Sequence, residues 1–490
     1  MPTCCRDTRV RPLLATGPSL VSLVSASSPY SLSKFLALDT YITVTPYWRK
    51  VLVVLIAPLP GLAAAVVPVF FPLQHPRLGP NLGYFAHVFW LTLASSFGTL
   101  IHLAEATSIP RELFSMTEIL VVSALSGVFQ CLNSYLLVKF VVYPIPFQLA
   151  LTSTPWMMSL GVALVLVLRR KFTQNPIFRE SLEAYRVCLP IQSIQLIVYP
   201  SLSVLYDHVN DTGKILVILS FPFAKYFMKK LLHRNSKHLG DFHAEVSVSG
   251  IEICASLYQS MILQTSPSAV SMIIVMGLDV VMGFLSIKVF LDRHGRCLEV
   301  PRDEIMATAI RRLHEPRTSA IVPTAAPVTS SSRRVSAGGK KKIENEPVVA
   351  AARGIADSVE RILLVEYFEV IVPIVNSVFL IIASVLPSAQ YNPRIAPLYH
   401  DHVRLKYALQ SIWLYSLLQG LSCAVMHYVM KHRYGISALD HLAFVLDRHR
   451  DSIQGKMIPW LPLILHFTLI QYGTDFTFRF KFDDESVPPG

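Results

Sequence analysis

The chain has 490 residues, of which 52% are hydrophobic and only 16% are charged, and its mean hydropathy is +0.47. Soluble globular proteins carry about 25% charged residues, so this composition argues against a soluble enzyme and indicates an integral membrane protein. The net charge of +12 at pH 7 is a second bias, and its distribution along the chain is informative.

The seven cysteines form no Cys-x-x-Cys pair and no ligand-like grouping with histidine, which argues against a disulfide framework or a zinc site. The sequence also has no phosphate-binding loop, no Gly-x-Ser-x-Gly elbow and no His-Glu-x-x-His helix. We therefore expect no metal, no cofactor and no catalytic residues of these types.

The membrane segments follow a basic, serine-rich N-terminal region, residues 1–49, which we interpret as a cytoplasmic tail. A helix needs about 20 mostly apolar residues to cross a bilayer. Eleven segments meet this description: Val51–Phe71, Tyr84–Ala104, Thr117–Val138, Phe147–Leu168, Tyr185–Tyr206, Ile215–Met228, His243–Leu263, Ala269–Leu291, Ile362–Ala389, Tyr407–Met430 and Met457–Tyr472.

The predicted fold is therefore all-α, an integral membrane helical bundle of about eleven transmembrane helices. Ten spans remain an alternative, because the sixth segment is short and contains Lys225, and the seventh contains Glu245 and Glu252. Lys225 and Lys288 lie near predicted cytoplasmic ends, where we expect their side chains to reach back to the interface.

The distribution of basic residues predicts the orientation, because cytoplasmic loops of membrane proteins are rich in Lys and Arg. With a cytoplasmic N-terminus, 33 of the 44 basic residues fall on the cytoplasmic side and 8 on the opposite side. The same loops would face anionic lipid, so the bilayer is the expected partner and nucleic-acid binding is not.

The predicted domains follow from these spans. Residues 50–291 form a membrane bundle of eight spans, and 292–361 a basic, largely disordered cytoplasmic loop with a candidate kinase site at Ser336. Residues 362–472 add three spans and an amphipathic interfacial helix near 437–453, which would begin at Ser437. Residues 473–490 form a C-terminal tail.

Polar residues recur every three or four positions in several spans, which places them on one helical face. The stripes are Thr92, Ser95, Thr99 and His102; Ser123, Ser126, Gln130 and Asn133; Glu245, Ser249, Glu252, Ser256 and Gln259; and Glu366, Glu369, Pro373 and Asn376. They predict either close helix packing or a polar route through the bundle, lined by residues such as His102, Gln130, Asn133 and Asn376.

Carboxylates inside spans carry more weight, since an isolated ionised group in lipid is strongly disfavoured. Glu252 and Asp279 lie nearest to mid-span and are candidates for ion or proton coupling. Glu366 and Glu369 lie one turn from the predicted cytoplasmic end and would stand at the inner mouth of a route.

Toward the C-terminus, the segments Met426-His427, Arg433-Tyr434-Gly435-Ile436-Ser437 and Asp475-Phe476-Thr477-Phe478 stand in the last third of the chain. This part resembles the C-terminal part of polytopic membrane proteins that are numerous in oomycetes. The resemblance implies a multipass membrane protein and assigns neither an activity nor functional residues.

The leading functional hypothesis is a secondary transporter of a small solute with proton or cation coupling, which would not be an enzyme. One alternative is a non-transporting membrane scaffold or sensor regulated through the basic loop around Ser336. Another is a membrane-embedded acyltransferase that uses an intramembrane histidine, such as His102 or His427, as a base. The sequence does not distinguish the plasma membrane from an internal membrane.

Overall fold

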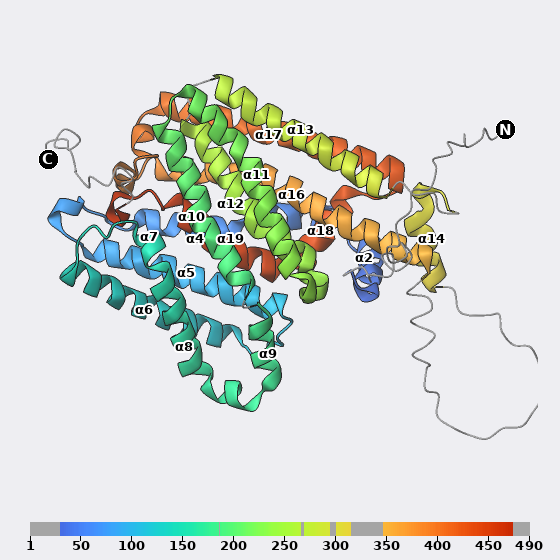
Figure 1. Cartoon of the computed structure of the whole chain (residues 1–490), viewed down its shortest axis with the longest axis horizontal. Coiled ribbons are helices and arrows are strands. Elements are labelled where there is room, and N and C mark those ends of the chain that lie inside the picture. Colours follow the sequence, from blue (N-terminus) through green and yellow to red (C-terminus); the bar gives the residue numbers. More distant parts are fainter. Residues whose placement is uncertain (1–29, 186, 266–268, 295–299, 315–345, 474–490) are drawn as a thin grey trace, which may run out of the picture.

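The computed structural model describes residues 30–185, 187–265, 269–294, 300–314 and 346–473 and consists of packed helices (Figure 1). No strand occurs in these ranges, so the predicted all-α class is confirmed for the described part of the chain. Two helix starts show how local sequence sets the boundaries. Asn81 caps α5 by accepting the N–H of Tyr84, and Ser115 and Glu118 form a reciprocal capping box at the start of α6.

The α-helices of the described residues are α2 (Leu32–Val44), α3 (Tyr47–Ile56), α4 (Leu59–Val66), α5 (Leu82–Ala106), α6 (Met116–Phe140), α7 (Gln148–Leu151), α8 (Ser153–Gln174), α9 (Pro176–Tyr185), α10 (Cys188–His208), α11 (Asp211–Asn235), α12 (His243–Thr265), α13 (Ala269–Arg293), α14 (Ile305–His314), α16 (Pro347–Ala383), α17 (His402–Tyr434), α18 (Ala438–Arg448) and α19 (Arg450–Leu465). Short 3₁₀ turns connect several of them, at Val67–Phe70, Pro76–Leu78, Lys237–Phe242, Arg302–Glu304, Pro387–Tyr391, Ala396–Leu398 and Ile470–Tyr472.

Eight helical segments of the described residues are long and apolar enough to cross a membrane. They coincide with eight of the eleven predicted spans: Tyr47–Phe70, Leu82–Ala106, Met116–Phe140, Phe178–Tyr206, Lys237–Gln264, Ile273–Arg293, Pro347–Ala383 and His402–Tyr434. The other three predicted spans are also helical. Their helices are shorter or less apolar than the other eight. Helix α8 carries Arg169-Arg170-Lys171 near its C-terminal end, α11 carries four lysines, and α19 has only 16 residues.

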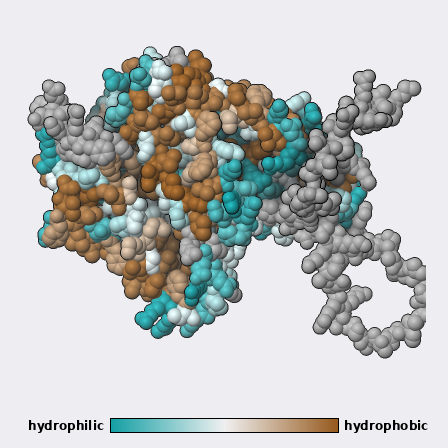
Figure 2. All heavy atoms as spheres, viewed as in Figure 1, coloured by the Kyte–Doolittle hydropathy of each residue, from teal (hydrophilic) through white to brown (hydrophobic). Residues whose placement is uncertain are grey.

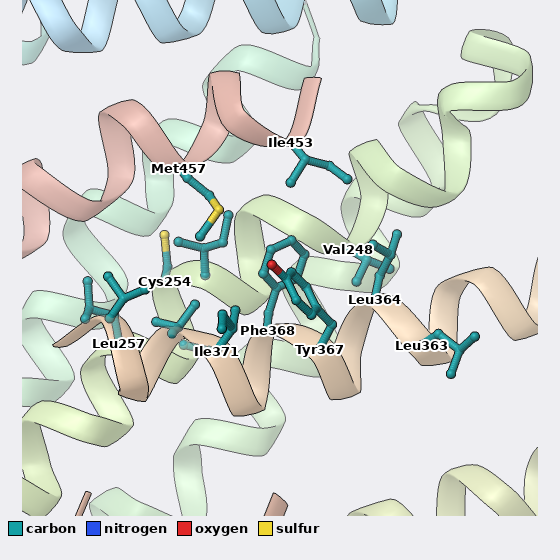
Figure 3. Packing of buried hydrophobic residues seen from close by; sticks show 14 of the residues in the cluster. Val248, Cys254, Leu257, Leu363, Leu364, Tyr367, Phe368, Ile371, Ile453 and Met457 are labelled. Atoms are coloured by element: carbon teal, nitrogen blue, oxygen red, sulfur yellow. The ribbon is translucent and has the colours of Figure 1, made fainter. Parts of the chain in front are cut away.

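Helix α12 lies at the centre of the bundle, and its most apolar window is wholly buried. It packs against α10, α11, α16, α17 and α19. Figure 3 shows the apolar side chains of α12, α16 and α19 meeting in one core, with Phe368 and Tyr367 of α16 next to Val248 of α12 and Met457 of α19 nearby. Burial of this kind contributes roughly 1.5–3 kcal/mol for each large apolar side chain.

Apolar residues also cover much of the outer surface. Figure 2 shows them over the sides of α10, α13 and the pair α5–α6, whereas hydrophilic residues gather at the α11–α12 connection and at the tip between α8 and α9. Exposed side chains such as Leu132 of α6, Phe223 of α11 and Leu417 of α17 belong to this surface. A surface of this composition fits a membrane environment better than water.

Two predicted surface segments are more ordered and more buried than expected. From residue 30 onward the N-terminal region is folded, because α2 packs on α16 and α18. The predicted amphipathic helix exists as α18, with Ser437 as its N-cap as predicted, but its apolar face packs on α2, α3 and α16 instead of facing lipid. Ring contact between Tyr41 and Phe444 is part of that packing.

Part of the predicted disordered loop 292–361 is helical. Residues 305–314 form α14, and α16 begins at Pro347, fifteen residues before the predicted span. The apolar residues Val348, Ala352, Ile355 and Val359 recur at helical spacing and are buried, which explains this extension. Ser336 lies outside the described residues.

Candidate functional site

Two of the predicted coupling residues pair with one largely buried lysine. Lys225 Nζ of α11 lies 2.7 Å from Glu252 Oε2 of α12 and also pairs with Glu369 of α16, and Lys229 of α11 forms a second ion pair with Glu252. Glu252 is fully buried, and the side chain of Lys225 is 15% exposed. We call Lys225, Lys229, Glu252, Asp279, Glu366 and Glu369 the carboxylate cluster.

Asp279 of α13 is held by neutral hydrogen-bond donors. The Tyr415 hydroxyl donates to Asp279 Oδ2 at 2.7 Å, Gln419 Nε2 donates at 3.1 Å, and Gln259 Nε2 donates at 3.2 Å. The three helices that contribute to this part of the cluster, α12, α13 and α17, are therefore tied together through one side chain.

Glu366 completes the cluster on α16, one turn before Glu369. It is 3% exposed, and its Oε2 atom has no hydrogen-bond partner among the described residues. The cluster thus contains four carboxylates and two ammonium groups. With every group ionised it would carry two excess negative charges in the bundle interior, a state that low-dielectric surroundings disfavour.

The lysines are the part of this cluster that sequence reasoning missed. Lys225 was expected to reach toward the interface, but it points to Glu252 and Glu369 in the interior. A usable signal was present, since Lys225 and Lys229 are four residues apart and share a helical face. Two adjacent cations on an otherwise apolar face predict buried acidic partners on neighbouring helices.

A second polar network joins α5, α12 and α19 and is called the His102 network. The Ser452 hydroxyl donates to Glu245 Oε2 at 2.7 Å and lies 2.7 Å from His102 Nδ1. The other ring nitrogen of His102 contacts the Tyr185 hydroxyl. Lys456 Nζ lies 3.1 Å from Glu245 Oε1.

Lys456 and Ser452 were not predicted, because both fall in the segment expected to form a cytoplasmic connection before the last span. The structure places them inside the bundle, where Lys456 also donates to Ser249 Oγ at 2.7 Å. The predicted stripe of α12 is therefore divided. Glu245 and Ser249 face α19, whereas Glu252 and Gln259 face α11 and α13.

Two cavities lie in a row along α5. The Gln130 cavity has a volume of about 40 Å³ and is lined by residues of α5, α6, α8, α10 and α19, including Thr92, Ser95 and Gln130. The His102 cavity has a volume of about 50 Å³ and is lined by Thr99, His102, Gln192 and Lys456. Both share the lining residues Trp156, Leu196 and Leu463.

The predicted polar lining is thus found in part. Thr92, Ser95 and Gln130 line the Gln130 cavity, and Thr99 and His102 line the His102 cavity. Asn376 does not, because it packs against α12 and donates to Ser260 Oγ at 3.1 Å. Asn133 lines neither cavity, and its buried Nδ2 has no partner among the described residues.

In the described residues, no three or more His, Cys, Asp and Glu side chains converge in a way that could hold a metal ion. The chain matches no protein-family model, no curated protein and no solved structure. Functional inference therefore rests on the geometry of the carboxylate cluster, the His102 network and the two cavities.

Proposed function

We propose that the protein is a secondary transporter that moves a small solute and couples this movement to protons or cations through the carboxylate cluster. The observation that carries the proposal is the excess of carboxylates over lysines inside the bundle, with Glu252 fully buried and Glu366 nearly so. Because buried uncompensated charge is costly, such a cluster favours binding of a proton or a cation. Coupling of solute movement to protons or cations requires a group that gains and loses charge in this way.

The same proposal includes eleven spans with a cytoplasmic N-terminus. Segments expected on the cytoplasmic side bind one another at one end of the bundle. The Ser31 N–H donates to Asp241 Oδ1 at 2.7 Å, Arg111 pairs with Asp451 at 2.6 Å, and Lys171 Nζ donates to the carbonyl of Leu113 at 2.9 Å. Five of the predicted cytoplasmic segments are joined by these three contacts.

Segments expected on the opposite side, and the residues at the start of α7 and at and after the end of α19, also bind one another. The Phe147 N–H donates to the carbonyl of Gly473 at 2.9 Å, and Gln471 Nε2 donates to the carbonyl of Gln74 at 3.0 Å. Asn392 Nδ2 donates to the carbonyl of Leu465 at 3.2 Å. If the chain crosses the membrane eleven times, each set of contacts lies on one side of the membrane. Both sets therefore support α8, α11 and α19 as additional spans.

Basic residues at the proposed cytoplasmic end would face the anionic leaflet, so we expect anionic lipid to bind there.

Neither alternative function has comparable support. His427 Nδ1 accepts the N–H of Ala438, and the ring nitrogens of His102 contact the Ser452 and Tyr185 hydroxyls, so both histidines already have partners within the protein. The scaffold hypothesis depends on Ser336, outside the described residues, and deletion of residues 318–346 would test it.

The test of transport uses the purified protein in liposomes with an inward proton gradient and a panel of small labelled solutes. We expect accumulation of a solute to depend on the gradient and to be lost in Glu252→Gln. Glu183→Gln is the matched control, because Glu183 forms an exposed ion pair with Arg179. Wild-type, gradient-dependent flux in the Glu252→Gln, Asp279→Asn double variant would overturn the coupling mechanism.

A further inference from the structure

The two cavities along α5 lie next to each other, share three lining side chains and have a polar floor. Thr92 and Ser95 line the first cavity, and Thr99 and His102 line the second. Ten residues of α-helix extend about 15 Å, so this floor covers about half of a hydrocarbon core about 30 Å thick. We call the combined feature the α8/α10 groove.

Three polar atoms at the floor of the groove have no protein partner. They are Ser95 Oγ, Gln130 Oε1 and Gln192 Nε2, and none of them has a hydrogen-bond partner within the described ranges. The three residues are 2%, 4% and 7% exposed. Leaving a buried polar group unsatisfied is costly, so the groove is built for a ligand that both donates and accepts hydrogen bonds.

The charges near the groove are already compensated. Lys456 lines the His102 cavity, but its ammonium group lies 3.1 Å from Glu245 Oε1 and donates to Ser249 Oγ at 2.7 Å. The other polar groups of the floor are hydroxyls, amides and the imidazole of His102, whose ring nitrogens contact the Ser452 and Tyr185 hydroxyls. This lining suits an uncharged group with several hydroxyls, and it offers no free cation for an anionic ligand.

Residues of both α8 and α10 line the groove. Helix α8 packs on α6 and on its neighbours α7 and α9, and α10 packs on α11 and α12, but α8 and α10 scarcely touch each other. The side chains shared by both cavities, Trp156, Leu196 and Leu463, are half-buried and apolar at this rim. The Trp156 indole N–H donates to Ser96 Oγ at 2.9 Å and is the hydrogen bond that joins α8 to α5.

From these observations we infer that the α8/α10 groove binds the uncharged, hydroxyl-bearing head group of an amphiphile that enters sideways from the bilayer. The polar floor would hold the head group, while the apolar rim would leave the hydrocarbon part in lipid. This inference names the substrate class of the transporter proposed above and rests on that proposal. A free polyol shares the head-group chemistry, so the experiment separates the two sources.

The experiment places the full chain in phosphatidylcholine nanodiscs that contain increasing amounts of monogalactosyl diacylglycerol with brominated acyl chains. Quenching of tryptophan fluorescence reports binding, because Trp156 and Trp460 line the groove. Brominated phosphatidylcholine is the reference lipid, since Trp48 and Trp413 are exposed and contact any surrounding lipid. We expect saturable extra quenching by the galactolipid at a few per cent of total lipid.

The Gln130→Leu, Gln192→Leu double variant is expected to weaken galactolipid binding about tenfold, because each amide contributes one hydrogen bond. Gln195→Leu is the matched control, since Gln195 lies on the same helix as Gln192, is 1% exposed and lines neither cavity. If the double variant does not remain monodisperse, Ser95→Ala serves instead, with an expected weakening of about threefold.

Three outcomes would overturn the inference. These are equal quenching by both brominated lipids, equal weakening by Gln195→Leu, and displacement of the galactolipid by free galactose at millimolar concentration, which would show entry from water. The Glu252→Gln variant, measured for both galactolipid binding and proton-coupled flux, separates this inference from the proposed function. Galactolipid binding without proton-coupled flux in the wild type contradicts the transporter alone, whereas coupled flux of a water-soluble solute without galactolipid binding contradicts the groove alone.

Discussion

Gly98 of α5 and Gly455 of α19 lie backbone to backbone where the two helices cross. A Cβ atom added to Gly98 would lie 2.6 Å from the carbonyl oxygen of Gly455, and one added to Gly455 would lie 2.8 Å from that of Gly98. No side chain fits between backbones at this distance, so the close approach of α5 and α19 requires both glycines. This crossing holds Lys456 next to the floor of the α8/α10 groove.

Gly98→Ala is therefore expected to lower the free energy of unfolding by about 1–3 kcal/mol, because the new methyl group overpacks the crossing. The measurement is denaturant unfolding in mixed micelles. Gly161→Ala on α8 is the control, since a Cβ atom there would meet nothing within 4 Å. Equal stability of the two variants would contradict the requirement for glycine at the crossing.

Lys34→Met should destabilise the docking of α2. Lys34 Nζ lies 2.8 Å from Glu360 Oε2, and their side chains are 1% and 0% exposed. Removing one partner of a buried pair leaves the other charge uncompensated, at a cost of about 3–5 kcal/mol. Unfolding measurements should also show that the Lys34→Met, Glu360→Leu double variant regains more than half of this loss.

A matched control for that pair is Arg179→Met, because the Arg179–Glu183 pair is 71% and 58% exposed. Exposed pairs of this type contribute about 0.3–0.5 kcal/mol. A loss in Lys34→Met no larger than in the control would mean that the buried pair does not stabilise the docked helix.

Stability should decrease as the pH falls below about 6.5, in part because of His441 of α18, which lies outside the membrane-spanning segments. Burial, followed by the nearby charge of Lys34, lowers the pKa of His441 to about 3. The pKa of an unfolded histidine is about 6.5, so between these values the unfolded chain binds more protons. Folding stability then falls by about 1.4 kcal/mol per pH unit.

A comparison of His441→Gln with the wild type isolates this contribution. Between pH 7 and pH 5 the wild type should lose about 2 kcal/mol more free energy of unfolding than the variant. This pH range follows from the lowered pKa of His441. The contribution of neutral His441 to folding stability is complete above pH 6.5 and is lost toward pH 3. Parallel pH profiles for the two proteins would contradict this assignment.

The proposed orientation predicts which loops receive glycans. A flexible glycosylation tag inserted after Leu78, which is 74% exposed, should be modified in microsomal membranes. The same tag after the exposed Glu112 should remain unmodified, because that connection belongs to the opposite end of the bundle. Modification of the Glu112 tag alone would reverse the orientation.

Hydrophobic length and helical periodicity predicted most of the helices, because a membrane span must satisfy its backbone hydrogen bonds internally. The same periodicity placed Ser95 and His102 on one face, and both line the groove. The partners across the bundle were not predictable in this way. Lys225 and Lys456 look like interfacial residues in the sequence, and only the packing of α11 and α19 against α12 shows their contacts with Glu252 and Glu245.

Helix α2 and the packing of α18 inside the protein were missed for a related reason. Hydropathy windows detect long apolar runs, but α2 and α18 are short and are stabilised by contacts with each other and with α16. The salt bridge between Lys50 Nζ and Asp440 Oδ1, at 2.7 Å, joins residues 390 positions apart in the sequence. No local pattern in a single sequence indicates such a pair.

The sparse contact between α8 and α10 has a mechanical consequence. Lys171 fastens one end of α8 to Glu118 of α6, whereas the opposite end is held to α5 by the hydrogen bond from Trp156 to Ser96. A tilt of α8 about its Lys171 end would break that bond, which contributes about 0.5–1.5 kcal/mol, together with part of the packing of α8 on α6, and would leave the ion pairs around α12 intact. Trp156 therefore acts as a latch between α8 and α5.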